Sequence, residues 1–263
     1  MQKALWIAAL VGTVCAVLSC YLVLKGWALM GDAVSHAVLP GVVIAYIVGL
    51  PVVAGAFAAG LFSAVATGFL KENSRIKEDT VMGIVFSGMF GLGIVLFTQF
   101  QPEQHLDHIL FGNLLGIARH DLIETSVIAI ATLFVVIAKR RDLLLYCFDP
   151  QHAQAIGLPV SQLYYGLLIV LALTIVASLK AVGIILVVAM LIGPGATAFL
   201  LTSRFDWMVS VAVGSAVLAS VVGVLVSFHI DGATGPCIVL VQTALFLLAL
   251  GYSLLHRRHV TVG

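Results

Sequence analysis

Two residues with metal-binding side chains, Asp32 and His36, stand four positions apart in an otherwise apolar part of the chain. Residues with this spacing lie on the same face of an α-helix, one turn from each other. A carboxylate and a neutral imidazole placed in this way can hold a divalent cation between them. Because ionisable groups are costly in hydrocarbon, the spacing predicts a functional site.

A structural interpretation of the same pair competes with the metal site. Asp32 would cap the N-terminus of a helix, and His36 would hydrogen-bond to a neighbouring helix. This interpretation does not explain a histidine one turn deeper, next to Ser35. We therefore predict that both side chains contact metal. Two ligands per chain bind weakly, as suits an ion that must leave the site again.

The composition indicates that the setting of this pair is a membrane. Hydrophobic residues make up 62% of the 263 residues and charged residues 10%, whereas a soluble domain carries about 25% charged residues. The net charge of +1 does not favour a nucleic-acid partner. The four cysteines form no CxxC pair and are interpreted as small buried side chains. We expect a single transmembrane permease domain over residues 1–263.

Polar, glycine and proline residues divide the chain into about nine apolar runs, each long enough to cross a bilayer as a helix. The runs cover residues 4–24, 30–49, 52–70, 81–99, 122–138, 162–179, 181–201, 207–228 and 236–255. The predicted fold class is all-α, a polytopic membrane protein of about 8–9 transmembrane helices. The first run is expected to be retained and not cleaved as a signal peptide.

Three places in these runs could interrupt a helix. The junctions Gly49-Leu50-Pro51 and Leu179-Lys180-Ala181 are so tight that one neighbouring run could be a broken helix or a half-crossing. Gly193-Pro194-Gly195 is expected to kink or break the seventh run. Breaks of this kind in membranes often line a cavity.

The basic residues predict the orientation. If nine spans alternate, ten of the thirteen Lys and Arg residues fall on one side, which is then cytoplasmic together with the C-terminus. The outer loop at residues 99–121 is predicted to form a funnel through which metal enters, or else to be a solvated loop that docks a binding protein. The funnel candidates are Glu103, His105, Asp107 and His108, with His229 and Asp231 in a second outer turn. His120 and Asp121 are interpreted as residues that cap the start of the fifth span.

A second long loop, residues 141–161, predicts a short helix on the cytoplasmic side. Asp149 can act as its N-cap, with Pro150 at the first helical position. Gly157 can close the helix, and Pro159 prevents its continuation.

Residues 31–41, GDAVSHAVLPG, resemble the signature of the permease subunit of manganese/zinc/iron ABC importers. Further stretches match this family in the same order: RIKEDTVMGIVF at 75–86, FGNLLG at 111–116, and VGIILV at 182–187, followed by Pro194 and ATA at 196–198. The resemblance covers nearly the whole chain. Pro40, where many zinc members have leucine, is more like the manganese/iron branch.

The resemblance implies a membrane subunit that acts with partners. Two permease copies pair in the membrane, two ABC ATPase subunits bind beneath them, and an extracellular binding protein (a lipoprotein or a periplasmic protein) delivers the metal. The short cytoplasmic helix then resembles the coupling helix that contacts the ATPase. Its candidate contact residues are Asp149, Gln151, His152, Ala153 and Gly157. The chain has no GxxxxGK[ST] motif, so ATP hydrolysis is expected on a separate subunit and not in this chain.

The implied protein is a permease of the bacterial cell (inner) membrane that passes Mn²⁺, or else Fe²⁺, to the cytoplasm, with no permanently bound cofactor. A zinc permease of the same family is the first alternative, and a stand-alone secondary transporter is the second. An intramembrane metalloenzyme would need a third strong ligand and a general base, and the sequence has no HExxH motif. The residues do not determine which metal is transported. They also do not determine whether the permease forms a homodimer, which we expect, or a heterodimer.

Overall fold

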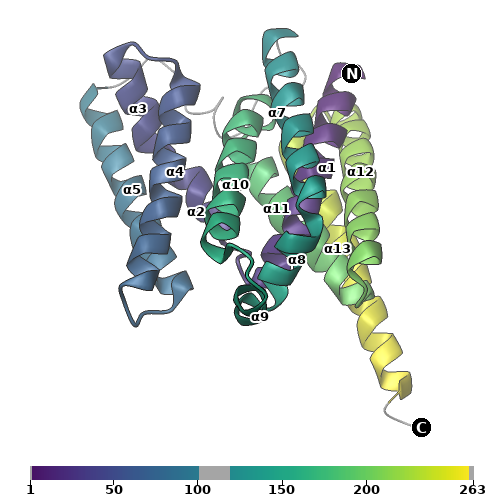
Figure 1. The fold of residues 1–263 in the computed structure, drawn as a ribbon. Coiled ribbons are helices and arrows are strands. Elements are labelled where there is room, and N and C mark those ends of the chain that lie inside the picture. Colours follow the sequence, from purple (N-terminus) through teal and green to yellow (C-terminus); the bar gives the residue numbers. More distant parts are fainter. Residues whose placement is uncertain (1, 101–118, 261–263) are drawn as a thin grey trace.

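The computed structural model of the chain describes residues 2–100 and 119–260, and every element within them is a helix (Figure 1). The helices are α1 (Gln2–Lys25), α2 (Met30–Ala37), α3 (Leu39–Val48), α4 (Val52–Glu72), α5 (Glu78–Phe100), α7 (Arg119–Ala138), α8 (Arg140–Phe148), α9 (Pro150–Ala155), α10 (Val160–Val182), α11 (Ile184–Leu201), α12 (Phe205–Ile230) and α13 (Thr234–Val260). Within these residues, nine segments are long and apolar enough to span a bilayer. The predicted all-α fold with 8–9 spans is confirmed.

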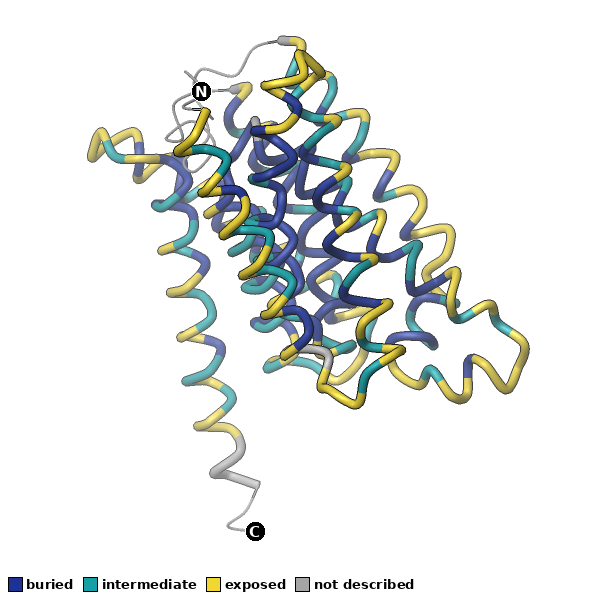
Figure 2. The backbone as a smooth tube through the Cα atoms, turned by 90° about the vertical axis from the view of Figure 1, so that its left-hand side faces the viewer, coloured by how far each residue is buried: buried dark blue, intermediate teal, exposed yellow. Residues whose placement is uncertain are grey.

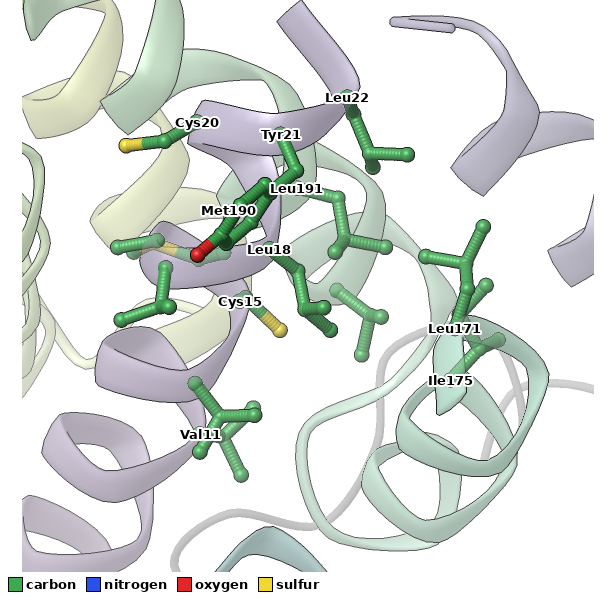
Figure 3. Packing of buried hydrophobic residues seen from close by; sticks show 14 of the residues in the cluster. Val11, Cys15, Leu18, Cys20, Tyr21, Leu22, Leu171, Ile175, Met190 and Leu191 are labelled. Carbon is green, nitrogen blue, oxygen red and sulfur yellow. The ribbon is translucent and has the colours of Figure 1, made fainter. Parts of the chain in front are cut away.

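Helix α1 forms the centre of the bundle. It packs against α11, α12 and α7, and 72% of its spanning segment is buried, compared with 17% for α5 and for α13. Figure 3 shows side chains of α1, among them Cys15 and Leu18, packed near Met190 and Leu191 of α11. Figure 2 shows the exposed residues on the outside of the bundle, where many are large and apolar. A surface of this kind suits contact with lipid.

The second span is broken into α2 and α3 at Val38. Pro40 has no N–H to donate to the carbonyl of His36 four residues earlier, so the helix cannot continue in the ordinary way. The carbonyl of His36 accepts instead from the N–H of Val38. The second span, which is next to the tight junction Gly49-Leu50-Pro51, is therefore a broken helix, as one of the alternatives for these runs predicts.

The two tight junctions are both made by glycine. Gly49 ends α3 with a φ of 75°, and Pro51 precedes α4, as the tight turn there predicts. The next junction differs from the prediction, because α10 continues through Lys180 to Val182 and the chain turns at Gly183. Gly183 has φ 80° and ψ 163°, a conformation that is essentially restricted to glycine.

Helix α11 continues through Pro194, so the run is not broken there, and the alternative of a kink stays a prediction. Ser19 of α1 replaces the bonding that the proline disturbs. Its Oγ accepts from the N–H of Gly195 at 3.0 Å and donates to the carbonyl of Ile192 at 3.2 Å. A Cβ on Gly195 would lie 2.4 Å from this Oγ, so the contact requires glycine.

The predicted short helix after the fifth span is confirmed as α9. Asp149 Oδ1 accepts from the N–H of His152 at 2.9 Å, and Pro150 is the first helical residue. Gly157 follows with a φ of 85°, and the N–H of Leu158 donates to the carbonyl of Ala153 at 3.0 Å. The rest of the predicted loop is more ordered than expected, because α8 (Arg140–Phe148) includes residues 141–148 of the loop.

Candidate metal site

Asp32 and His36 lie on one face of α2, as their spacing predicts. Nε2 of His36 is 3.4 Å from Oδ1 of Asp32, and the two side chains are 28% and 41% exposed. Two ligand atoms at about 2.1 Å from one ion, with a tetrahedral angle between them, are about 3.4 Å apart. The pair therefore has the separation of two neighbouring ligands of a single cation.

Small residues set the position of α2 among its neighbours. A Cβ on Gly31 would lie 2.9 Å from the Leu191 side chain of α11, and a Cβ on Gly60 of α4 would lie 3.4 Å from Val34. Ser35, buried between the two site residues, donates from its Oγ to the carbonyl of Gly31 at 2.6 Å. These close approaches leave little room for α2 to move sideways.

Two phenylalanines of α5 form a wall beside the imidazole. The ring centroids of Phe86 and Phe90 are each 5.4 Å from that of His36. Tilted and edge-on ring contacts at this distance are favourable and orient the rings. The wall limits the rotation of the imidazole and excludes water from that side.

The neighbours of α2 show how deep the pair lies. Leu191 is ten residues from the end of α11 and Gly60 is twelve residues from the end of α4, which correspond to about 15 and 18 Å of helix. The hydrocarbon core of a bilayer is about 30 Å thick. The pair is thus near mid-depth.

The connection before α2 explains this depth, because it folds back into the bundle. Trp27 is 2% exposed, and its backbone N–H donates to the carbonyl of Leu22 at 2.7 Å. Its indole ring contacts the ring of Tyr164 in α10 edge-on, with 5.2 Å between the ring centroids. The chain therefore turns inside the protein, and α2 begins well within the membrane.

The capping alternative for Asp32 does not match the structure. Leu29 occupies the N-cap position of α2, and no side chain of the described residues makes a capping hydrogen bond there. Asp32 is in the first turn instead, where a carboxylate is favoured by the helix dipole but remains available to a ligand.

The other candidate residues are at the two ends of the molecule. Glu103, His105, Asp107 and His108 lie outside the described residues. His229, in the last turn of α12, is hydrogen-bonded through Nδ1 to the carbonyl of Leu225 at 2.8 Å. Asp231 ends α12 with a φ of 48°. Both residues are exposed, and their role in metal entry stays a prediction.

One further group of possible metal ligands, on α7, was not predicted from the sequence. His120, Asp121 and Glu124 have ligand atoms within 4.8 Å of one another. Residues 101–118, which precede α7, lie outside the described part of the chain, so the capping role of His120 and Asp121 stays a prediction. Helix α7 packs mainly against α10 and α1, whereas α2 packs mainly against α5. The group is therefore separate from the Asp32–His36 pair.

The five coupling candidates differ in burial and in what each contributes to α9. Ala153 is completely buried, Asp149 caps α9, and Gly157 supplies the turn after it. Gln151 and His152 are exposed on α9. Asp149 and Gly157 are exposed as well, but the Asp149 side chain is engaged in the cap and glycine has no side chain. Gln151 and His152 therefore offer the side chains that a partner could reach most freely.

The nine spanning segments in the described part of the chain, packed around one another, define the class as a polytopic membrane protein. The family model of the ABC 3 transport family matches residues 1–253, and the chain belongs to this family. It is accordingly the membrane subunit of an ABC transporter, and the predicted permease role is confirmed.

The chain is 64% identical to the chelated iron transport system membrane protein YfeD of Yersinia pestis over 253 residues, which are 96% of this chain and 85% of that protein. It is 54% identical to the manganese transport system membrane protein MntB of a Synechocystis species, with 94% and 81% covered. Among solved structures, PsaBC from Streptococcus pneumoniae in complex with Fab matches with a TM-score of 0.84 at 39% identity, covering 94% of this chain and 90% of that one.

Proposed function

We propose that the chain conducts a divalent transition metal, Mn²⁺ or Fe²⁺, inward across the bacterial cell (inner) membrane, and that Asp32 and His36 bind the ion on its way. The observation that supports this most is the 3.4 Å separation of Nε2 and Oδ1, at mid-depth in a chain whose family transports substrates. The names of its relatives include both iron and manganese transport.

The proposed site is completed by other ligands. One carboxylate oxygen and one imidazole nitrogen supply two ligands, while metals of this class take four to six. A second copy of the permease, with its own pair, would double the number, and water can fill the remaining positions. A shell assembled from two chains releases its ion when the chains move apart, as transport requires.

The partners in this proposal are an ABC ATPase beneath the membrane and an extracellular metal-binding protein. Helix α9 is the proposed ATPase contact, through the exposed side chains of Gln151 and His152. Asp149, Ala153 and Gly157 keep that helix in shape and in place. His229, Asp231 and the acids and histidines of residues 103–108 would meet the incoming metal on the outer side.

The ligand types favour a borderline metal without fixing which one. Carboxylate oxygen suits Mn²⁺ and Fe²⁺, and imidazole disfavours Mg²⁺ and Ca²⁺. Zn²⁺ accepts the same two ligands, so a zinc permease is the main competing proposal. Selectivity among the three metals depends on the geometry of the complete shell.

Uptake of radioactive Mn²⁺ by cells that express the whole transporter tests the proposal. We expect Asp32→Asn and His36→Gln each to lower uptake at least about tenfold, because each removes one ligand. Ser35→Ala is the matched control on the same turn of α2, and it should keep uptake within about twofold because it removes one hydrogen bond within the helix.

Equal amounts of all variants in the membrane would show that insertion is intact. Normal uptake by both site variants, or equal losses in all three, would contradict the site. Competition by unlabelled Fe²⁺ and Zn²⁺ identifies the metal, and failure of an ABC ATPase to co-purify would favour a stand-alone transporter.

A further inference from the structure

A groove of about 460 Å³ opens between α7, α8 and α10, at the end of the bundle that carries α9. Apolar residues line most of it, among them the buried Val136, Leu163 and Leu167. Its polar lining residues are Lys139, Asp142 and Gln162. The groove is therefore apolar inside and charged at one end.

The floor of the groove is open because of one glycine. Among the described residues, no atom lies within 4 Å of the Cβ that a side chain at Gly166 would add. Beside this hollow, Val135 and Ile169 are 46% and 42% exposed, on spanning helices whose outer faces meet lipid. An apolar cavity does not hold water stably, so the surrounding acyl chains are the natural occupant.

The length of the groove matches one leaflet of a bilayer. On α10 it runs from Pro159 to Val170, which corresponds to about 16 Å of helix. Half of the hydrocarbon core is about 15 Å. An acyl chain that begins at the level of the charged residues would thus end near the middle of the membrane.

The mouth of the groove carries one positive and one negative side chain, which are opposite in charge to the phosphate and the amine of a zwitterionic lipid headgroup. Lys139 Nζ is 3.5 Å from Asp142 Oδ2, and the two side chains are 63% and 36% exposed, so the pair costs little to open. Next to Lys139, Arg140 is paired with Asp206, and Arg141 lines a different cavity. Lys139 is therefore the basic residue that faces this groove.

We propose that this groove binds one phospholipid with a phosphoethanolamine headgroup. Its acyl chain fills the space over Gly166, Lys139 binds the phosphate and Asp142 accepts hydrogen bonds from the primary ammonium. A choline headgroup has no N–H to donate, and a glycerol headgroup has no positive charge for Asp142. The site is independent of the proposed metal pathway, and lipid binding and metal uptake can fail separately.

Native mass spectrometry of the permease, purified in a mild detergent, tests the acyl site. We expect one bound phosphoethanolamine lipid per chain, and at least a fivefold loss in Gly166→Leu, whose side chain fills the groove. Gly214→Leu on α12 is the matched control, because the space around that Cβ is equally open in the described residues. Equal lipid in Gly166→Leu and the wild type would overturn the proposal.

A second variant tests the headgroup and does not depend on repacking. The wild type, exchanged into equal mixtures of ethanolamine, choline and glycerol phospholipids, should enrich the first at least threefold. The exposed double variant Lys139→Gln, Asp142→Asn should bind the three without preference. An unchanged preference in the double variant, or no preference in the wild type, would refute the headgroup assignment. Loss of a bound protein, and not of lipid, in Gly166→Leu would assign the groove to a protein contact.

Discussion

Helices α3 and α4 meet through two glycines, and adding a single methyl group there should destabilise the permease. A Cβ on Gly41 would be 2.1 Å from the carbonyl oxygen of Gly55, and a Cβ on Gly55 would be 2.3 Å from the carbonyl oxygen of Gly41. Ala45 and Ala59 stand four residues further along each helix. The Cβ of Ala59 would be 2.5 Å from a Cβ added at Gly41, and the Cβ of Ala45 would be 2.5 Å from a Cβ added at Gly55. Small residues repeated in this way let the two backbones touch.

The size of the effect follows from this geometry. An alanine at Gly41 forces the helices apart by more than about 1 Å, and overpacking of this kind costs about 1–3 kcal/mol. The higher helix propensity of alanine offsets up to about 1 kcal/mol of this cost. We expect Gly41→Ala to lower the free energy of unfolding by about 2 kcal/mol. Because His36 is five residues away along the chain, metal uptake should fall as well.

Reversible unfolding in mixed detergent micelles measures this change. Gly91→Ala on α5 is the control, because among the described residues no atom lies within 4 Å of the Cβ it would add. That variant should be unchanged or more stable, by up to about 1 kcal/mol. Equal stabilities of the two variants would refute the reasoning, since they would show that α3 and α4 do not interlock.

Two further predictions concern α9 and the buried cysteines. Asp149→Ala removes the cap that bonds the N–H of His152 and should destabilise α9 by about 1 kcal/mol; it should also lower the metal transported per ATP hydrolysed in the reconstituted transporter, and an unchanged ratio would separate α9 from coupling. The four cysteines are free and buried, and burial raises the pKa of the Cys147 thiol to about 12. Its thiolate is therefore scarce below that pH in the folded protein. Because all four side chains are buried, maleimide at pH 8 should label none of them until the chain is unfolded in SDS; rapid labelling of Cys147 in the native permease would contradict the packing around α8.

The sequence predicts features that depend on neighbouring residues. The spans follow from the length of the apolar runs, α9 follows from its cap and its closing glycine, and the Asp32–His36 pair follows from helical spacing. Contacts between segments that are far apart in the sequence cannot be predicted from neighbouring residues. The ring contacts of Phe86 with His36, and the bond from Gly195 to Ser19 across 176 positions, exist only after packing.

Proline shows the same limit from another direction. Pro194 and Pro40 are both inside apolar runs, yet α11 continues through the first and the second span breaks near the other. The difference depends on what surrounds each proline. Ser19 supports the backbone beside Pro194, whereas the carbonyl of His36, four residues before Pro40, is bonded to the N–H of Val38.

The break at Val38 makes α2 a short helix that can change its angle relative to α3. The helix has eight residues and is about 12 Å long, and it is joined to α3, which the interlocked glycines fix on α4. A tilt of about 5° moves one end of such a rod by about 1 Å relative to the other. Metal–ligand distances tolerate only about 0.2 Å, so in the proposed site a tilt of this size would separate the Asp32–His36 pair from ligands supplied by a second chain and would release the ion.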